Sequence, residues 1–148
     1  MPANTDITRK AVAQADAYFD NGFHCAEAVA AAVLETLGKD SKEAAAHATA
    51  FGGGFAGSHQ EACGALAGAL IAIGHLHGRR IPREGWNLPA QLGTNLRERF
   101  LADFGTTHCA TLRDKFGEGQ QPAECRRVVR KTTHAIMEIL SVLHKPKL

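Results

Sequence analysis

The segment at residues 58–78, SHQEACGALAGALIAIGHLHG, places two glycines four residues apart inside an apolar stretch. Gly64 and Gly68 share one face of a predicted helix, and each costs about 1 kcal/mol of helix propensity relative to alanine. Such a cost is offset when another backbone approaches that face closely. Apolar residues cover much of the remaining circumference, so we expect this helix to be central, with other helices packed on more than one side.

A helix start is predicted just before this apolar stretch. Ser58 and Glu61 have the spacing of a capping box, in which each side chain bonds a backbone amide near the other residue. The pattern predicts a helix that begins at His59 and ends near Gly78, with Cys63 in its second turn. This helix therefore joins a reactive side chain to a close-packing glycine face.

Nearly every other part of the chain also has helical periodicity. Apolar residues recur every three or four positions, and glycine, proline or polar capping residues separate the periodic segments. No segment alternates between polar and apolar residues as a strand would. The sequence predicts an all-α fold, a single domain of residues 1–148 with five to seven helices around the central glycine- and alanine-rich helix. The expected helices cover residues 5–19, 24–37, 40–51, 59–78, 88–104, 107–116 and 122 to the C-terminus.

Two connections carry unusual residues. The loop at residues 51–58, FGGGFAGS, has glycines that permit backbone angles closed to other residues and let amides approach an anion or a sulfur atom. A phosphate-binding loop is the less favoured interpretation, because the lysine and the serine or threonine of a P-loop are missing. Trp86, the only tryptophan, lies in the connection at residues 78–87, and we expect it to pack over an edge of the core.

Charge and hydropathy argue against several classes of partner. Lys and Arg number 17 and Asp and Glu number 15, with the signs intermixed, so nucleic-acid binding is not indicated. No apolar run approaches the roughly 18 residues that a membrane span needs, and the N-terminal MPANTDITRK lacks the apolar core of a signal peptide. We therefore expect a soluble, cytoplasmic protein with no membrane or nucleic-acid partner.

Four cysteines carry the chemical signal. Cys25, Cys63, Cys109 and Cys125 each follow a break in the chain and fall within about two turns of a predicted helix start. A helix N-terminus carries about half a positive charge, which lowers a thiol pKa. Converging thiolates would form a ligand set for tetrahedral zinc or an iron–sulfur cluster. The simpler interpretation, favoured by the lack of a CxxC pair, is that each cysteine is a small buried apolar residue.

Five segments in a fixed order resemble a known family: FHCAEAV, FGGGFAG, EACGALAGAL, THCATLRD and AECRRVV, within residues 23–129. They are similar to the redox-active proteins named for their C_GCAxxG_C_C cysteine pattern, although the central segment here reads ACGALAG. The resemblance implies a small helical protein whose cysteines serve redox chemistry or metal binding. It singles out the metal ligands Cys25, Cys63, Cys109 and Cys125, with Gly53, Gly54 and Gly68 as backbone companions at the cofactor.

A similar domain in split-Soret cytochromes holds a non-haem iron–sulfur centre, so this resemblance implies an iron–sulfur cluster, with zinc or iron as alternatives. The chain has no CxxCH, and covalent c-type haem is not expected. His24, His59 and His108 lie near cysteines and are candidate replacement ligands, but helix capping or a hydrogen bond to a thiolate is the favoured interpretation. No residue is assigned as a general acid or base, so the catalytic residues are unknown and enzymatic activity stays open.

Three functions remain open. The leading hypothesis is a redox protein that binds an iron–sulfur cluster or other metal through the four cysteines, with electron transfer to a redox protein partner as one role. The first alternative is a metal-free thiol–disulfide protein or sensor, in which Cys109 and Cys125 are the better pair because they are closest in sequence. The second is a non-catalytic interaction module whose face of Gly64, Ala67 and Gly68 packs on a second copy of the chain as a homodimer. Packing of this face on a helix of the same chain is favoured over a homodimer.

Overall fold

The computed structural model describes residues 2–144, with side chains at residues 5–143. Within this part the regular structure is helical, and the only β contact is an isolated antiparallel bridge between Ala62 and His108. The all-α fold expected from the sequence is confirmed. The helices are α1 (Pro2–Asp20), α2 (Cys25–Thr36), α3 (Lys42–Ala48), α4 (Gly64–His77), α5 (Asn87–Phe104), α6 (Cys109–Phe116) and α7 (Gln121–Ser141), with the short 3-10 helices η1 (Thr49–Phe51) and η2 (Val142–His144).

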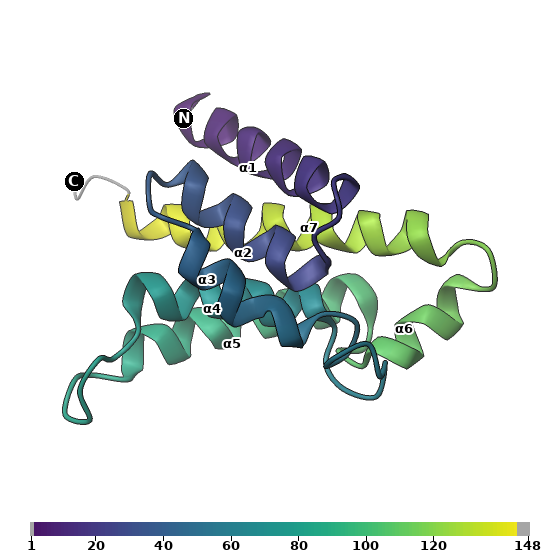
Figure 1. The fold of residues 1–148 in the computed structure, drawn as a ribbon. Coiled ribbons are helices and arrows are strands. Elements are labelled where there is room, and N and C mark those ends of the chain that lie inside the picture. Colours follow the sequence, from purple (N-terminus) through teal and green to yellow (C-terminus); the bar gives the residue numbers. More distant parts are fainter. Residues whose placement is uncertain (1, 145–148) are drawn as a thin grey trace.

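The helices α2 and α4 form the centre of the bundle. α2 contacts α1, α3, α4 and α7, while α4 contacts α2, α3, α5 and α7. Figure 1 shows α1 at the top of the bundle and α4 and α5 at the bottom, with α2 between them. The sequence of α2 explains its position, because it is rich in alanine and valine and is buried at Ala26 and throughout residues 28–34. Small side chains on all its faces let several helices pack against it.

Gly68 lies where the backbones of α2 and α4 meet. A Cβ atom added at Gly68 would overlap the carbonyl oxygen of Ala26 and would lie 2.9 Å from the carbonyl carbon of that residue. A Cβ atom added at Gly64 would overlap the sulfur atom of Cys25. The glycine face is thus filled by α2 of the same chain, and the close approach that the two glycines predict is present.

The helix start expected at His59 is wrong, because α4 begins at Gly64 and Cys63 is its N-cap residue. Ser58 does not cap this helix, since its hydroxyl donates to the carbonyl oxygen of Gly54 at 2.6 Å inside the glycine loop. His59 has a φ of 62°, in the left-handed region that a right-handed helix excludes. Cys63 therefore lies at the beginning of the helix and not in its second turn.

Hydrogen bonds to the start of α6 explain the displaced boundary. The N–H of Cys109 donates to the carbonyl oxygen of Glu61 at 2.9 Å, and the N–H of Cys63 donates to that of Thr107 at 2.7 Å. These bonds use backbone groups that a helix through residues 59–63 would have paired within itself. Tertiary pairing has replaced the local helix here.

Most other boundaries agree with expectation, with small shifts. α5 ends as expected at Gly105, whose φ is 78°, and α3 passes into the 3-10 helix η1, which ends at Phe51. Pro122 occupies the second position of α7 and not the first. Trp86 is 63% exposed, so the expectation that it packs over the core is wrong. The cause is its place at the N-cap of α5, ahead of the buried stripe that begins at Leu92.

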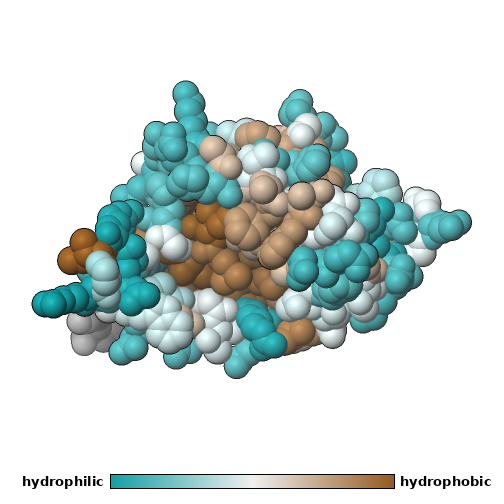
Figure 2. Space-filling model, turned by 60° about the horizontal axis from the view of Figure 1, so that its bottom comes forward, coloured by the Kyte–Doolittle hydropathy of each residue, from teal (hydrophilic) through white to brown (hydrophobic). Residues whose placement is uncertain are grey.

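One face of the molecule is apolar. Figure 2 shows an apolar hollow on the face that includes α4, surrounded by polar side chains. Leu70 of α4 is 42% exposed and Phe55 of the glycine loop is 40% exposed. None of the described helices is both long enough and apolar enough to cross a membrane. The groove on this face is lined by Phe51, Phe55, Ala62, Leu66, Ala67, Leu70 and Ile71.

Candidate functional site

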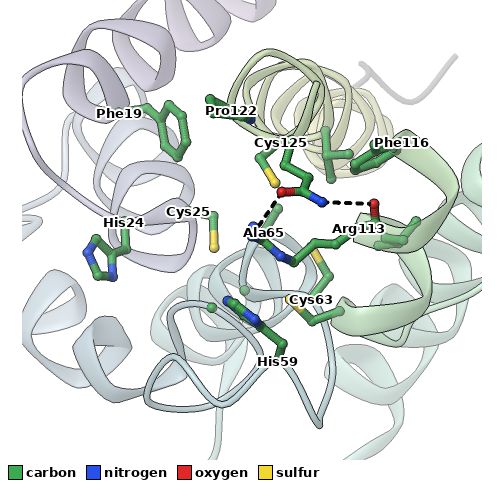
Figure 3. Close-up of a pocket in the computed structure, with 16 residues that line it drawn as sticks. Phe19, His24, Cys25, His59, Cys63, Ala65, Arg113, Phe116, Pro122 and Cys125 are labelled. Carbon is green, nitrogen blue, oxygen red and sulfur yellow. Dashed lines mark hydrogen bonds between the residues drawn. The ribbon is translucent and has the colours of Figure 1, made fainter. Parts of the chain in front are cut away.

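All four cysteines line one cavity of about 260 Å³. Each reaches it from a different helix start: Cys25 is the first residue of α2, Cys63 is the N-cap of α4, Cys109 is the first residue of α6, and Cys125 lies early in α7. Figure 3 shows Cys25, Cys63 and Cys125 around the same space. The structure therefore brings together four residues that are far apart in the sequence.

The walls of this cavity are mainly sulfur and apolar groups. No Asp or Glu of the described residues lines it, while His24 and His59 border it. A thiol-rich site without carboxylates suits soft metal ions and iron–sulfur clusters better than magnesium or calcium. The apolar wall is formed by Phe19, Ala65, Leu112, Phe116, Pro122 and Val128.

The four thiols share one cavity but do not form a ready-made site for one metal ion. Among the side chains that the structure describes, at residues 5–143, no three His, Cys, Asp or Glu form a group that could hold an ion as they are placed. The four cysteines nevertheless all line the same space.

The glycine loop has an uncommon backbone conformation beside this cavity. Every residue from Gly53 to Gly57 has a positive φ, between 53° and 73°. Phe55 and Ala56 are not glycine, and each costs about 1–3 kcal/mol in this region. The N–H of Gly57 donates to the carbonyl oxygen of Gly52 at 3.0 Å, which closes the turn. The result places the backbone of Gly53, without a side chain, against the cavity.

The three glycines expected beside a cofactor take different places. Gly53 lines the cavity. Gly54 packs behind Cys109, where an added Cβ atom would lie 2.6 Å from the Cβ atom of that cysteine. Gly68 lies at the contact with Ala26 and is not among the residues that line the cavity. Gly54 and Gly68 thus position the elements that carry the cysteines, while Gly53 is the one of these three that borders the space between them.

His108 caps α6, in the place where a threonine cap was expected. Its Nδ1 accepts the N–H of Thr111 at 3.3 Å, which leaves the ring proton on Nε2. Nε2 then donates to the carbonyl oxygen of Gln60 at 2.8 Å. Thr106, two residues earlier, also contributes, because its hydroxyl accepts the N–H of His108 at 3.1 Å. His108 does not line the cavity, so the favoured capping role is confirmed for this histidine.

Two polar residues at the cavity were not singled out from the sequence. The guanidinium of Arg113 donates to Oε1 of Gln121 at 3.3 Å, and Nε2 of Gln121 donates to the carbonyl oxygen of Arg113 at 3.5 Å (Figure 3). Among the described residues, Arg113 is the only lysine or arginine that lines the cavity. It follows Cys109 by four positions, which puts both on one face of α6 and is the signal that could have found it.

Burial dominates the electrostatics of Cys63. Burial and, after it, the neighbouring Cys25 raise the pKa of Cys63 to about 12. The N–H groups of Ala65 and Leu66, in the first turn of α4, lower this pKa but do not reverse the shift. The positive end of the helix is present here, and desolvation of the thiolate outweighs it.

The same cause acts on two further thiols. Burial is the largest contribution raising the pKa values of Cys109 and Cys125, and the charge of Arg113 lowers both without cancelling the rise. The expectation that helix starts lower the pKa is therefore wrong for Cys63, Cys109 and Cys125. At neutral pH these three thiols are therefore mostly protonated.

The rates of alkylation should follow the burial of the four thiols. At pH 8, iodoacetamide should modify Cys25 and Cys125, which are partly exposed, before Cys63 and Cys109, which are buried. A pKa of about 12 leaves only about one Cys63 thiol in 10⁴ ionised at pH 8, and the thiolate is the reactive form. The rate at Cys63 should therefore rise about tenfold per pH unit up to pH 10. Peptide mass spectrometry of reduced, chelator-treated protein measures each rate; equal rates at Cys63 and Cys125 would contradict the burial described here.

The fold and the cavity define a class of small all-α proteins in which cysteines from separate helices surround one space. The chain belongs to the family described as "Putative redox-active protein (C_GCAxxG_C_C)", whose model matches residues 23–139. The resemblance inferred from the cysteine segments is confirmed, and all four cysteines and the glycine loop lie inside the matched range. Comparison with curated proteins and with solved structures gave no match.

Proposed function

We propose that this protein binds an iron–sulfur cluster through Cys25, Cys63, Cys109 and Cys125 and exchanges electrons with a redox protein partner. The observation that carries the proposal is that these four thiols, from four separate helices, line one cavity. Cysteine thiolates are the usual ligands of such clusters, and four of them complete the set. Membership of a family described as redox-active supports the same chemistry.

The size of the cavity favours a cluster over a single zinc or iron ion. Zinc bound to four thiolates has Zn–S distances of about 2.3 Å, so the four sulfur atoms crowd around one point. A cluster distributes its cysteine ligands over several iron atoms and occupies a wider space, for which a cavity of about 260 Å³ offers room.

The residues around the cavity would serve this cofactor in distinct ways. The bound cluster would supply a one-electron redox group, and the four thiolates would hold it. The N–H groups of Ala65 and Leu66 are directed at the sulfur of Cys63 and would offset part of its negative charge. Phe19 and Phe116 would keep water from the sulfur atoms.

The test is anaerobic reconstitution of the reduced protein with ferrous iron and sulfide. We expect a brown protein that retains iron and acid-labile sulfide in equal amounts after desalting, with visible absorption that dithionite bleaches. A colourless protein that retains no iron would contradict the proposal. Retention of iron or zinc without sulfide would also contradict it and would favour a single-ion site.

A metal-free thiol–disulfide protein is the other outcome that this experiment separates. Its signature would be the joint loss of two thiols on mild oxidation, counted by mass spectrometry, in protein that takes up no metal. The raised pKa values of Cys109 and Cys125 would slow this chemistry at neutral pH, because a protonated thiol is a poor attacking group. A disulfide would use two of the four thiols that line the cavity and a cluster would use all four, so the cluster remains the proposal that the site supports best.

A further inference from the structure

We infer that Arg113 balances the negative charge of the four-cysteine site and raises its reduction potential, and that Gln121 positions Arg113 for this role. The inference rests on the proposed function, because it assigns to this chain's own residues the control of a cluster bound there. The groups involved belong to α6 and to the first residue of α7.

The position of Arg113 is the first observation. Its side chain lines the cavity together with the four cysteines, and no other lysine or arginine in the described part of the chain does so. Figure 3 shows the side chain extending from α6 towards the space that the cysteines surround. It is partly buried among apolar groups such as Leu112 and Phe116, where solvent screens a charge less than it does at the surface.

The second observation is that this charge has no carboxylate partner. Other arginines of the bundle are paired, for example Arg126 with Asp16 at 2.8 Å and Arg127 with Glu124 at 2.8 Å. Within the described part of the chain, no salt bridge involves Arg113. Its guanidinium donates to the neutral amide of Gln121, so no carboxylate of the described residues offsets its positive charge beside the cavity.

Gln121 fixes the guanidinium through a reciprocal pair of hydrogen bonds. Oε1 of Gln121 accepts from the guanidinium at 3.3 Å, and Nε2 donates to the main-chain carbonyl of Arg113 at 3.5 Å. The side-chain amide of Gln121 therefore bonds both the guanidinium and the main chain of Arg113. Because Gln121 also begins α7, it ties the orientation of the arginine to the helix that carries Cys125.

The electrostatic consequence follows from charge counting. Four thiolates carry four negative charges, and reduction of the bound cluster adds one more. A fixed cation nearby stabilises the more negative, reduced state more than the oxidised state, which raises the reduction potential. Arginine keeps its proton throughout the accessible pH range, so this contribution should not change with pH. The charge of Arg113 already acts on Cys109 and Cys125, whose pKa values it lowers.

Redox titration of reconstituted variants tests the inference. Arg113→Met should shift the midpoint potential to a more negative value by the same amount at pH 7 and pH 9, and Arg113→Lys should restore most of the wild-type potential. Gln121→Leu keeps the arginine and should give an intermediate shift. The matched control is Arg97→Met, which removes the same charge from an exposed position of α5 that does not line the cavity, and it should leave the potential unchanged.

Retention of the cofactor gives a second measurement. In competition with a chelator, Arg113→Met should lose iron about 10- to 100-fold more readily than the wild type, as expected when a partner of the ligands is removed. Circular dichroism of the metal-free variants separates this effect from misfolding. If Arg113→Met does not fold, the midpoint potential and the iron retention of Gln121→Leu provide the test.

The outcomes distinguish this inference from the proposed function. If the wild type forms a cluster and both Arg113→Met and Gln121→Leu have the wild-type midpoint potential, the proposed role of Arg113 is overturned, while the proposal of a bound cluster is retained. A shift equal to that of Arg97→Met would overturn it as well, since only net charge would matter. If the wild type binds no cluster, the proposed function fails first and this inference fails with it.

Discussion

Alanine in place of Gly68 is expected to lower the free energy of unfolding by about 3 kcal/mol or more, the upper range for overpacking a buried contact. The added Cβ atom would overlap the carbonyl oxygen of Ala26 on α2, which is backbone and cannot rotate away. Ala26 is fully buried, and α2 also packs on α1, α3 and α7, so α2 cannot shift without disturbing the rest of the core. Urea unfolding followed by circular dichroism measures the loss.

The same helix offers a matched control. Gly74→Ala adds a Cβ atom with nothing within 4 Å of it, so it should stabilise the protein by about 0.5–1 kcal/mol through helix propensity alone. The two substitutions are chemically identical and should have opposite signs. Equal stabilisation by both alanines would mean that α2 and α4 do not meet at Gly68.

The second large effect concerns the cysteines themselves. Serine in place of Cys25, Cys63, Cys109 or Cys125 should abolish the visible absorption of the reconstituted protein, because all four thiols line the cavity and a serine hydroxyl is not ionised at neutral pH. Iron and sulfide content after desalting should fall together with the absorption. The metal-free variants should keep their helical circular dichroism, which shows that the loss is one of ligands and not of the fold.

Ala110→Ser is the control for these variants. It introduces the same hydroxyl beside Cys109, at a position of α6 that does not line the cavity, and it should retain the full cluster. If one serine variant, such as Cys125→Ser, kept its iron and its spectrum, that cysteine would not be a ligand. The two histidines that border the cavity, His24 and His59, would then be the first candidates for the fourth position.

Helical periodicity and the paired glycines were sufficient to predict the all-α bundle and a close helix contact at Gly68. The same reasoning placed the start of α4 too early, because Ser58 and Glu61 carry a strong local signal for a helix cap. The structure uses that segment to pair with α6, through bonds such as that from the N–H of Cys109 to Glu61. A partner more than forty residues away in the sequence leaves no local trace in the periodicity.

The convergence of the cysteines was predictable in part, but their electrostatics were not. Cysteines near helix starts and the family resemblance suggested a shared site, whereas the lack of a CxxC pair favoured separate buried residues; the structure places all four on one cavity. The direction of the pKa shift depends on burial, which only the packed structure reveals, and at Cys63 burial outweighs the helix terminus. Arg113 was overlooked for a related reason: an arginine on a short helix is usually solvated, and only the packing of α6 on α7 turns this one towards the cavity.

The attachment of α6 has a consequence for how this protein would respond to its cofactor. α6 packs mainly on α7, and it carries Cys109, while Cys25 and Cys63 belong to the two central helices. A cluster bound by all of these cysteines would link the peripheral helix α6 to the central helices α2 and α4. Without the cluster, α6 would be held by its packing on α7 and by backbone bonds such as that from Cys109 to Glu61, so losing the iron would loosen this part of the molecule as well as remove the redox group.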